Sequence, residues 1–259
     1  MSRSEVGATG GSRTGGSVGD VGCPRGAEVW SHRGRLAADE TAPENTLEAF
    51  RAASAAGVDG VELDVWLTVD GEWVVHHDRC REEGRLDELR RSQIDPRVPC
   101  LSEALGACAV TTINVELKVP DETRRAEALK LGIGLGRYLE SSGAEIAPES
   151  RFLVSSFSSD AVEGARSAVS RSETGFLVSD VPDRLALTSL RRAGHSAIHP
   201  EHFNVNTEFV TIAHEVGLRV VAWTADEEGD IRRVIDAGVD AVISNVPLLA
   251  LAVRAAAHN

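Results

Sequence analysis

Several residue types are scarce in this sequence of 259 residues. Aromatic side chains make up 4% of it, methionine occurs once, and the four cysteines show neither C-x-x-C spacing nor a pairing pattern. This pattern argues against a disulfide framework and favours free thiols in a reducing compartment. Long apolar runs are absent too, since none reaches the ~18 residues of a transmembrane helix.

The start of the chain lacks the apolar segment of a signal peptide. Residues 1–26 are rich in glycine, serine and charged residues instead. We interpret them as a flexible N-terminal tail. Together with the missing apolar runs, this predicts a cytoplasmic protein without stable membrane insertion.

Positive charge is in short supply. The chain has 27 Lys and Arg against 40 Asp and Glu, so its formal net charge is −13. Such an acidic chain is a poor binder of nucleic acid, because the phosphate backbone repels it. A phosphate ligand bridged by a metal ion remains compatible with this charge, since a bound cation reverses the local field.

What the sequence does contain is a regular alternation of apolar segments of strand length with segments of helical period. The strands are expected at 27–33, 58–66, 111–118, 151–156, 174–179, 195–199, 218–223 and 239–244, with an accessory hairpin arm at 72–77 across the turn Asp70-Gly71. The helices are expected at 45–57, 101–108, 121–143, 159–169, 182–193, 206–217, 226–237 and 247–257.

Eight strands, each followed by a helix, predict an α/β fold with a parallel sheet. Eight such units in about 230 residues fit a closed (β/α)₈ TIM barrel over residues 27–259, with a short hairpin insertion after the second strand. A doubly wound open sheet is the alternative. It would need a glycine-rich turn after the first strand, and "S-H-R-G-R-L" (31–36) does not match G-x-G-x-x-G.

Reactive residues gather where the expected strands end. Glu62 and Asp64 lie two apart on the second strand, and Glu116 lies on the third, so all three carboxylates point to one mouth. Their mutual repulsion favours a shared cation, and oxygen ligands suit Mg²⁺, Mn²⁺ or Ca²⁺ better than Zn²⁺. The alternative is that the acids form salt bridges with Arg33 and Lys118.

Histidines and positively charged side chains are expected at the same end of the strands. His32 and His77 are candidates for a general acid and base, because histidine titrates near neutral pH. Arg33 and Lys118 would supply positive charge for an anionic substrate. A metal ion, two histidines and two positively charged side chains together suggest phosphoryl chemistry.

Other polar residues near these strand ends give weaker signals. Trp223 is a candidate for lining the pocket, whereas Trp30 and Trp66 are expected in the core. His199 ends the sixth strand and is expected at the same mouth. His76 is expected to be structural, because alternation along the strand turns it away from His77.

The serine-rich segment "S-S-F-S-S" (155–159) is expected to be a strand end and helix cap. No G-x-S-x-G frame surrounds it, which argues against a serine nucleophile.

At these residues the sequence resembles the glycerophosphodiester phosphodiesterase family. The ordered motifs that carry the resemblance are "H-R-G" (32–34), "A-P-E-N-T-L-E-A-F" (42–50), "G-V-D-G-V-E-L-D-V-W-L-T-V-D-G" (57–71), "V-V-H-H-D" (74–78), "N-V-E-L-K" (114–118), "V-V-A-W-T" (220–224) and "G-V-D-A-V-I-S-N-V-P" (238–247). The sequence departs from the family in a longer stretch between Gly34 and Pro43 and a shorter one after Asp78.

The resemblance implies a TIM-barrel phosphodiesterase that holds one divalent cation, Mg²⁺ or Ca²⁺, with Mn²⁺ as a further choice. By that analogy the metal ligands are Glu62, Asp64 and Glu116, the acid–base pair is His32 and His77, and Arg33 and Lys118 hold the phosphate. Glu44 would lie close to Arg33. The family cleaves glycerophosphodiesters to glycerol 3-phosphate and an alcohol, in lipid and glycerol metabolism.

Two other functions are compatible with the pattern. A lysophospholipase D-type enzyme would keep the chemistry and add an apolar groove or membrane-facing loop near the mouth. A catalytically silent phosphate-binding barrel would lack a metal ligand or a histidine, and this sequence has all of them. The expected partner is therefore a small-molecule phosphodiester substrate.

Overall fold

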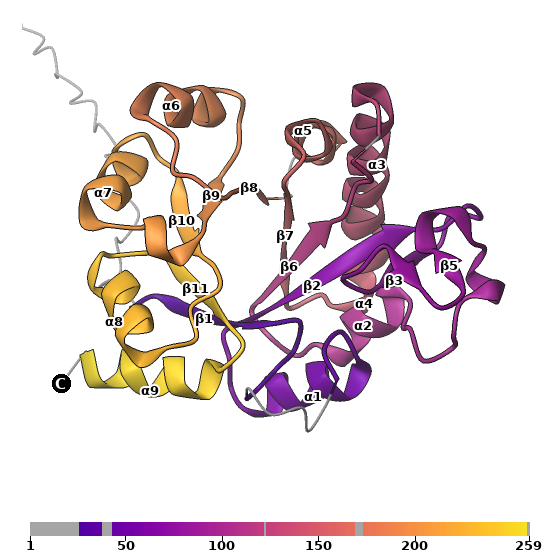
Figure 1. The fold of residues 1–259 in the computed structure, drawn as a ribbon, viewed down its shortest axis with the longest axis horizontal. Helices are drawn as coiled ribbons and strands as arrows, with labels where there is room; N and C mark the ends of the chain where they lie inside the picture. The colour runs from indigo at the N-terminus through magenta and orange to yellow at the C-terminus, as the bar shows by residue number, and fades with distance from the viewer. Residues whose placement is uncertain (1–25, 38–42, 122, 169–172, 258–259) are drawn as a thin grey trace, which may run out of the picture.

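A computed structural model describes residues 26–37, 43–121, 123–168 and 173–257. Within this part, eight parallel strands form a closed barrel in the order β1-β11-β10-β9-β8-β7-β6-β2, and β1 pairs with β2 to complete the circle (Figure 1). The strands are β1 (Glu28–His32), β2 (Gly60–Leu67), β6 (Thr112–Leu117), β7 (Arg151–Ser156), β8 (Glu173–Val178), β9 (Ala197–Pro200), β10 (Arg219–Ala222) and β11 (Ala241–Ser244). The predicted TIM barrel is confirmed, and the open sheet is wrong.

The expected hairpin follows the second strand. β3 (Trp73–Val75) pairs antiparallel with the outer end of β2. After β3 the chain forms a small insertion. It contains the paired strands β4 (Cys80–Arg81) and β5 (Gly84–Arg85) and the 3₁₀ turns η1 (Leu86–Glu88) and η2 (Arg91–Gln93). Its own apolar cluster, which includes Trp66, Val74 and Leu86, holds it in place.

Helices surround the strands (Figure 1). They are α1 (Leu47–Ala55), α2 (Leu101–Ala107), α3 (Arg125–Tyr138), α4 (Ala144–Ile146), α5 (Ser159–Ala168), α6 (Arg184–Arg192), α7 (Thr207–Glu215), α8 (Glu228–Asp236) and α9 (Pro247–Ala257), with a 3₁₀ turn η4 (His202–Asn204) before α7. In the described part of the chain, no helix combines the length and apolar character needed to cross a membrane.

Most helices are slightly shorter than the sequence predicted, and two of the differences have a clear local form. The helix expected at 121–143 begins at Arg125 and passes through a π-helical turn, η3 (Leu139–Gly143), into α4. The helix expected from residue 45 begins at Leu47, because Thr46 is its N-cap and accepts a hydrogen bond from the backbone N–H of Ala49. Asn45 before it has a left-handed backbone, with φ of 57°.

Two glycines, Gly132 in α3 and Gly164 in α5, have a packing role. A Cβ on Gly132 would lie 1.9 Å from the carbonyl oxygen of Ala161, and one on Gly164 would lie 2.2 Å from that of Leu129. Because glycine has no Cβ at these two positions, α3 and α5 lie side by side at very close range (Figure 1). Glycine weakens an isolated helix, but here it allows the two backbones to approach.

The barrel interior changes character from one end to the other. At the amino-terminal end Arg151 pairs with Glu28 at 2.6 Å, and Arg219 pairs with Glu173 at 3.0 Å. The middle is apolar and includes Trp30, Leu153, Ala197, Val221, Ala241 and Ile243. The acids and polar side chains that line the pocket lie at the other end, where the strands finish.

The prediction that His199 faces the mouth is wrong. Its side chain is fully buried inside the barrel, and its ring meets that of Trp30 edge-on at a centroid distance of 6.3 Å. The space for it comes from Gly175, since a Cβ there would lie 2.3 Å from Nε2 of His199. Burial lowers the pKa of His199 to about 3, so the ring is neutral in the core.

The close α3–α5 contact gives a stability prediction. Gly132→Ala should lower the free energy of unfolding by about 2 kcal/mol or more, because a methyl group must displace the backbone of α5. The matched control is Gly134→Ala in the same helix, where the nearest atom to a new Cβ is 3.7 Å away. That change should be neutral or stabilise by up to ~1 kcal/mol. Urea unfolding measures both, and equal effects would contradict the packing argument.

Candidate active site

A pocket of about 100 Å³ opens at the carboxyl-terminal end of the barrel strands. This is the end at which TIM-barrel enzymes carry their active sites. Its lining joins carboxylates, cations, imidazoles, small polar groups and apolar side chains. They are His32, Arg33, Glu62, His77, Asn114, Glu116, Lys118, Ser155, Phe157, Leu177, Trp223, Thr224 and Ile243.

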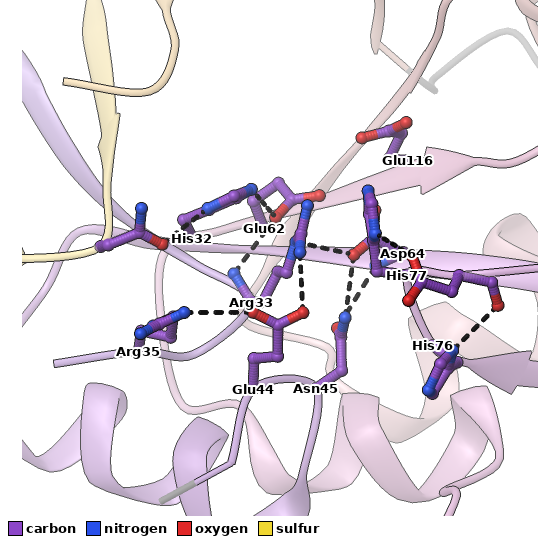
Figure 2. A network of polar contacts seen from close by, with 12 residues as sticks. His32, Arg33, Arg35, Glu44, Asn45, Glu62, Asp64, His76, His77 and Glu116 are labelled. Carbon is purple, nitrogen blue, oxygen red and sulfur yellow. Dashed lines mark hydrogen bonds and ion pairs between the residues drawn. The ribbon is translucent and has the colours of Figure 1, made fainter. Parts of the chain in front are cut away.

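Three buried carboxylates form one wall of the site. Glu62 and Asp64 alternate along β2 onto the inner face, and Glu116 on β6 is in register with Asp64. One oxygen atom from each residue lies within 4.8 Å of the others. The three side chains are therefore close enough to share one cation, as the strand alternation predicted (Figure 2).

The electrostatics of the three acids differ. Burial and the charges of Asp64 and Glu116 raise the pKa of Glu62 well above its usual value. Burial and Asp64 raise the pKa of Glu116 to about 7. Burial opposes ionisation of Asp64 as well, but Lys118 and Arg33 outweigh it and lower the pKa to about 2.

Ion pairs balance part of this charge. Nζ of Lys118 lies 2.9 Å from Oδ1 of Asp64 and also contacts Glu116, while Nε of Arg33 lies 3.2 Å from Oδ2 of Asp64. The salt-bridge alternative from the sequence is thus present in the structure. It does not exclude a cation, since these ion pairs involve Asp64 and Glu116 and leave out Glu62.

Glu62 is the carboxylate best suited to bind something further. Its Oε1 atom is buried and has no hydrogen-bond partner among the described residues. Its Oε2 atom accepts the backbone N–H of Arg33 at 3.1 Å. A buried carboxylate oxygen with no partner beside two other acids fits a cation-binding site.

A strained turn after β1 holds Arg33. Arg33 has a left-handed φ of 55°, and Gly34 follows with φ of 78°. A Cβ on Gly34 would lie 2.8 Å from the ring of Phe50, so the motif H-R-G packs directly on α1. Strain of this kind persists where neighbouring contacts enforce it, and it aims the guanidinium back at the acids.

The segment before α1 contacts both Arg33 and Asp64. Glu44 accepts a hydrogen bond from Nη1 of Arg33 at 2.7 Å, so the expected proximity of Glu44 to Arg33 is confirmed (Figure 2). Asn45 donates from Nδ2 to Oδ2 of Asp64 at 2.8 Å, and its backbone N–H donates to the carbonyl of Arg33. The longer stretch noted between Gly34 and Pro43 lies largely outside the described residues.

His32 has a fixed orientation. Its Nδ1 lies 2.8 Å from Oδ1 of Asn245, and its Nε2 lies 3.8 Å from Oε2 of Glu62. Asn245 in turn donates from Nδ2 and from its backbone N–H to the carboxylate of Asp226, at 2.7 and 2.8 Å. The amide is thereby oriented with its oxygen toward the ring, so Nδ1 of His32 donates and Nε2 carries the lone pair.

The second histidine sits on the loop after β3. Nδ1 of His77 lies 2.8 Å from Oδ1 of Asp78, and the ring is partly exposed at the rim of the pocket. His76 beside it points elsewhere, as the alternation predicted. Its Nδ1 contacts the carbonyl of Asp78 at 2.9 Å and its Nε2 contacts Arg81, which ties down the loop that carries His77.

The wall opposite the acids is apolar. Trp223 lines it, as expected from its place at a strand end, and its Nε1 donates to the carbonyl of His199 at 2.7 Å. The ring of Phe157 meets that of Trp223 edge-on at 5.5 Å, and Leu177 and Ile243 lie on the same side. The pocket therefore has one charged side and one apolar side.

The sequence reasoning assigned no catalytic or binding role to four polar residues at this site. Asn114 and Ser155 line the pocket, and Asp226 and Asn245 support His32. Asn245 and Ser155 were visible as polar residues at strand ends. Asp226 offers no signal in spacing, because it reaches the site from the β10–α8 loop.

Comparison with known proteins agrees with this geometry. The glycerophosphoryl diester phosphodiesterase family model matches residues 32–249. The chain is 29% identical to a glycerophosphodiester phosphodiesterase of Caldanaerobacter subterraneus, over 85% of this chain and 94% of that protein. It is 26% identical to one of Bacillus altitudinis, over 88% and 98%.

Solved structures share the fold. A putative glycerophosphoryl diester phosphodiesterase from Silicibacter pomeroyi matches with a TM-score of 0.78 at 24% identity, over 92% of this chain and 96% of that one. An Oleispira antarctica phosphodiesterase in complex with its product sn-glycerol-3-phosphate matches with a TM-score of 0.73 at 22% identity, over 88% and 96%.

The raised pKa values of Glu62 and Glu116 predict a stability that depends on pH and on cations. Folding binds extra protons between pH ~4.5 and about 7, so the metal-free protein should lose stability as pH rises through that window. A divalent cation replaces those protons, and its effect should grow over the same window. Calorimetry at pH 5 and pH 7.5, with EDTA or with Mg²⁺, Ca²⁺ or Mn²⁺, measures this.

We expect the cation to raise Tm by a few degrees more at pH 7.5, since ~1 kcal/mol shifts Tm by roughly 2–4 °C at this size. The control Glu116→Gln removes one titrating acid and should flatten both dependences. An equal cation effect at the two pH values would contradict the shared-cation site.

Proposed function

Because the chain belongs to the glycerophosphoryl diester phosphodiesterase family, we propose that it hydrolyses glycerophosphodiesters to sn-glycerol 3-phosphate and an alcohol with the help of one divalent cation. The observation that carries the proposal is that three carboxylates, two positively charged side chains and two imidazoles meet in one pocket. The product seen in the Oleispira antarctica phosphodiesterase supports the substrate class.

The cation would be held by Glu62, Asp64 and Glu116. When bound, it supplies a Lewis acid that withdraws charge from the phosphoryl oxygens. Oxygen ligands favour Mg²⁺ or Ca²⁺, with Mn²⁺ as a further choice. The carboxylates would then stay ionised, and Lys118 and Arg33 would be freer to face an anionic ligand.

His32 is suited to be the general base. Its Nε2 carries the lone pair, because Nδ1 donates to Asn245. Burial and the charge of Arg33 lower its pKa to about 4, so the ring is unprotonated and can accept the proton of an attacking hydroxyl. In the first step that hydroxyl is the substrate's own 2-hydroxyl, whose attack on phosphorus forms a cyclic phosphate and breaks the bond to the leaving alcohol. In the second step water opens the cyclic phosphate with the roles exchanged: His77 accepts the proton of the water, and His32 returns its proton to the 2-oxygen.

His77 is suited to be the general acid. It stands on a different element from His32 and next to the carboxylate of Asp78, which orients Nδ1 and leaves Nε2 to deliver a proton to the leaving alcohol. Its partly exposed position at the rim suits a leaving group that departs to solvent.

The remaining groups would bind the substrate. Arg33 and Lys118 would hold the phosphate, since each already faces the pocket and offers several donors. Glu44 would support Arg33 through their hydrogen bond. Trp223 would pack against the carbon atoms of the substrate. A cytoplasmic location stays a prediction from the sequence.

One observation favours testing lysophospholipids as a second substrate class. Phe157, Val181 and Phe203 follow the ends of β7, β8 and β9, and they are 50%, 36% and 63% exposed. Exposed apolar side chains on the loops at the mouth would suit an acyl chain. A lysophospholipase D-type activity would use the same catalytic groups.

The direct test measures release of glycerol 3-phosphate from glycerophosphocholine and glycerophosphoethanolamine, with each cation or with EDTA. We expect cation-dependent release that falls by roughly 10²–10⁴ in His32→Ala, the range for losing a general base. His214→Ala is the control, because His214 pairs with Asp240 near the amino-terminal end of the barrel. It should retain native activity.

Lysophosphatidylcholine is assayed in parallel. Release of choline from it, without release of glycerol 3-phosphate from the first two substrates, would replace the proposed function by the second one. No release from any substrate, by folded protein with each cation, would leave a silent phosphate-binding barrel.

The hydrogen bonds behind His32 give a further prediction. Asn245→Ala should lower kcat by roughly 10–100-fold with little change in KM, since support of this kind orients the imidazole without touching substrate. Asp226→Asn places two amides together and should also lower kcat. The exchanged pair Asp226→Asn/Asn245→Asp should recover much of the loss, because carboxylate and amide only change places. Additive losses in the pair would argue against an orienting role.

A further inference from the structure

Two polar side chains on the pocket wall each have an oxygen atom without a hydrogen-bond partner among the described residues. Asn114 on β6 and Ser155 on β7 are 1% and 0% exposed, and both line the pocket. Oδ1 of Asn114 and Oγ of Ser155 are buried without a hydrogen-bond partner in the described part of the chain. Buried polar groups in folded proteins are nearly always satisfied, so a partner from outside the chain is expected here.

The neighbouring serine shows that this feature is particular to Ser155. Oγ of Ser156 donates to the carbonyl of Leu117 at 2.7 Å and accepts the backbone N–H of Ser158 at 3.1 Å. Ser156 is therefore used by the backbone, as expected for a strand end before a helix. Ser155 alternates to the inner face of the barrel, where its hydroxyl meets the pocket.

The position of the two groups relates them to the charged wall. Asn114 is in register with Glu62, and Ser155 is in register with Glu116. Each unpaired group is thus the strand neighbour of a candidate metal ligand. If the phosphate of a ligand lies beside the carboxylates, Arg33 and Lys118, the atoms next to the phosphate would lie over Asn114 and Ser155.

The chemistry of this part of the pocket suits an uncharged polyol. An amide and a hydroxyl both donate and accept, and neither carries charge, so they match alcohol groups. Leu177, Trp223 and Ile243 offer apolar contact for carbon atoms on the other side. The volume of about 100 Å³ is well below the ~300 Å³ at which pockets for drug-sized ligands begin, so only a small unit fits.

We propose that Asn114 and Ser155 bind the terminal hydroxyl of the substrate's glycerol unit, the one farthest from the phosphate, and so select glycerol over alcohols that lack it. The inference rests on the proposed function and adds its specificity-determining residues. The 2-hydroxyl stays available to His32, while the terminal hydroxyl satisfies the two buried groups. Loss of that hydroxyl from the substrate would leave both groups unpaired, which is the condition under which polar sites discriminate strongly.

The test compares two substrates that differ in one oxygen atom. One is glycerophosphoethanolamine, and the other is its analogue with hydrogen in place of the terminal hydroxyl and with the 2-hydroxyl kept. The native protein should prefer the first by roughly 10–100-fold in kcat/KM, the cost of leaving a buried group unsatisfied. Ser155→Ala and Asn114→Leu should each cut that preference about tenfold, by lowering kcat/KM for the glycerol substrate alone.

Two controls keep the result interpretable. Ser156→Ala removes the adjacent hydroxyl that the backbone uses, and it should keep the native preference. The analogue itself reports on folding, because each variant should hydrolyse it at the native rate. Inhibition by sn-glycerol 3-phosphate gives a second readout, and its inhibition constant should rise about tenfold in Ser155→Ala.

The outcomes separate this inference from the function on which it rests. A native protein that hydrolyses the glycerol substrate, with both variants keeping its preference for the terminal hydroxyl, overturns the inference and leaves water as the partner of these groups. Equal loss of activity on both substrates overturns it as well and assigns the residues to the barrel's stability. A native protein that hydrolyses neither substrate refutes the proposed function and the inference together.

Discussion

The repulsion among three buried carboxylates is the constraint on which the rest of the barrel mouth depends. Glu62, Asp64 and Glu116 lie within 4.8 Å of one another in a region with little solvent. Two bases hold Asp64 ionised, while the pKa values of the other two acids are raised. The site is therefore short of positive charge, which fits a place where a cation and an anionic ligand could bind.

Contacts with these carboxylates hold the loops at the barrel mouth in place. Arg33 takes a left-handed backbone, its N–H donates to Glu62, and its guanidinium bridges Asp64 and Glu44. Asn45 links the segment before α1 to Asp64. Residues far apart in the chain are thus fixed by the same carboxylates they help to balance, so the acids organise the site before any ligand arrives.

The two ends of the barrel divide stability and chemistry. At the amino-terminal end, the two acids Glu28 and Glu173 are matched by the two bases Arg151 and Arg219. At the carboxyl-terminal end, charge is unbalanced and polar atoms of Glu62, Asn114 and Ser155 are unpaired. Unpaired polar groups cost stability, and their concentration at one end is typical of a site built for a ligand.

The sequence by itself determined the barrel, the hairpin after the second strand, and the convergence of carboxylates, histidines and cations at one mouth. Strand alternation and helical period are local properties, so spacing along the chain is enough to assign them. Only the tertiary structure showed that His199 is core, that Gly132 and Gly164 allow a close helix contact, and that Asp226 orients His32 through Asn245. These features depend on which distant strands and loops become neighbours, because burial and hydrogen bonding between segments leave no periodic mark in the sequence.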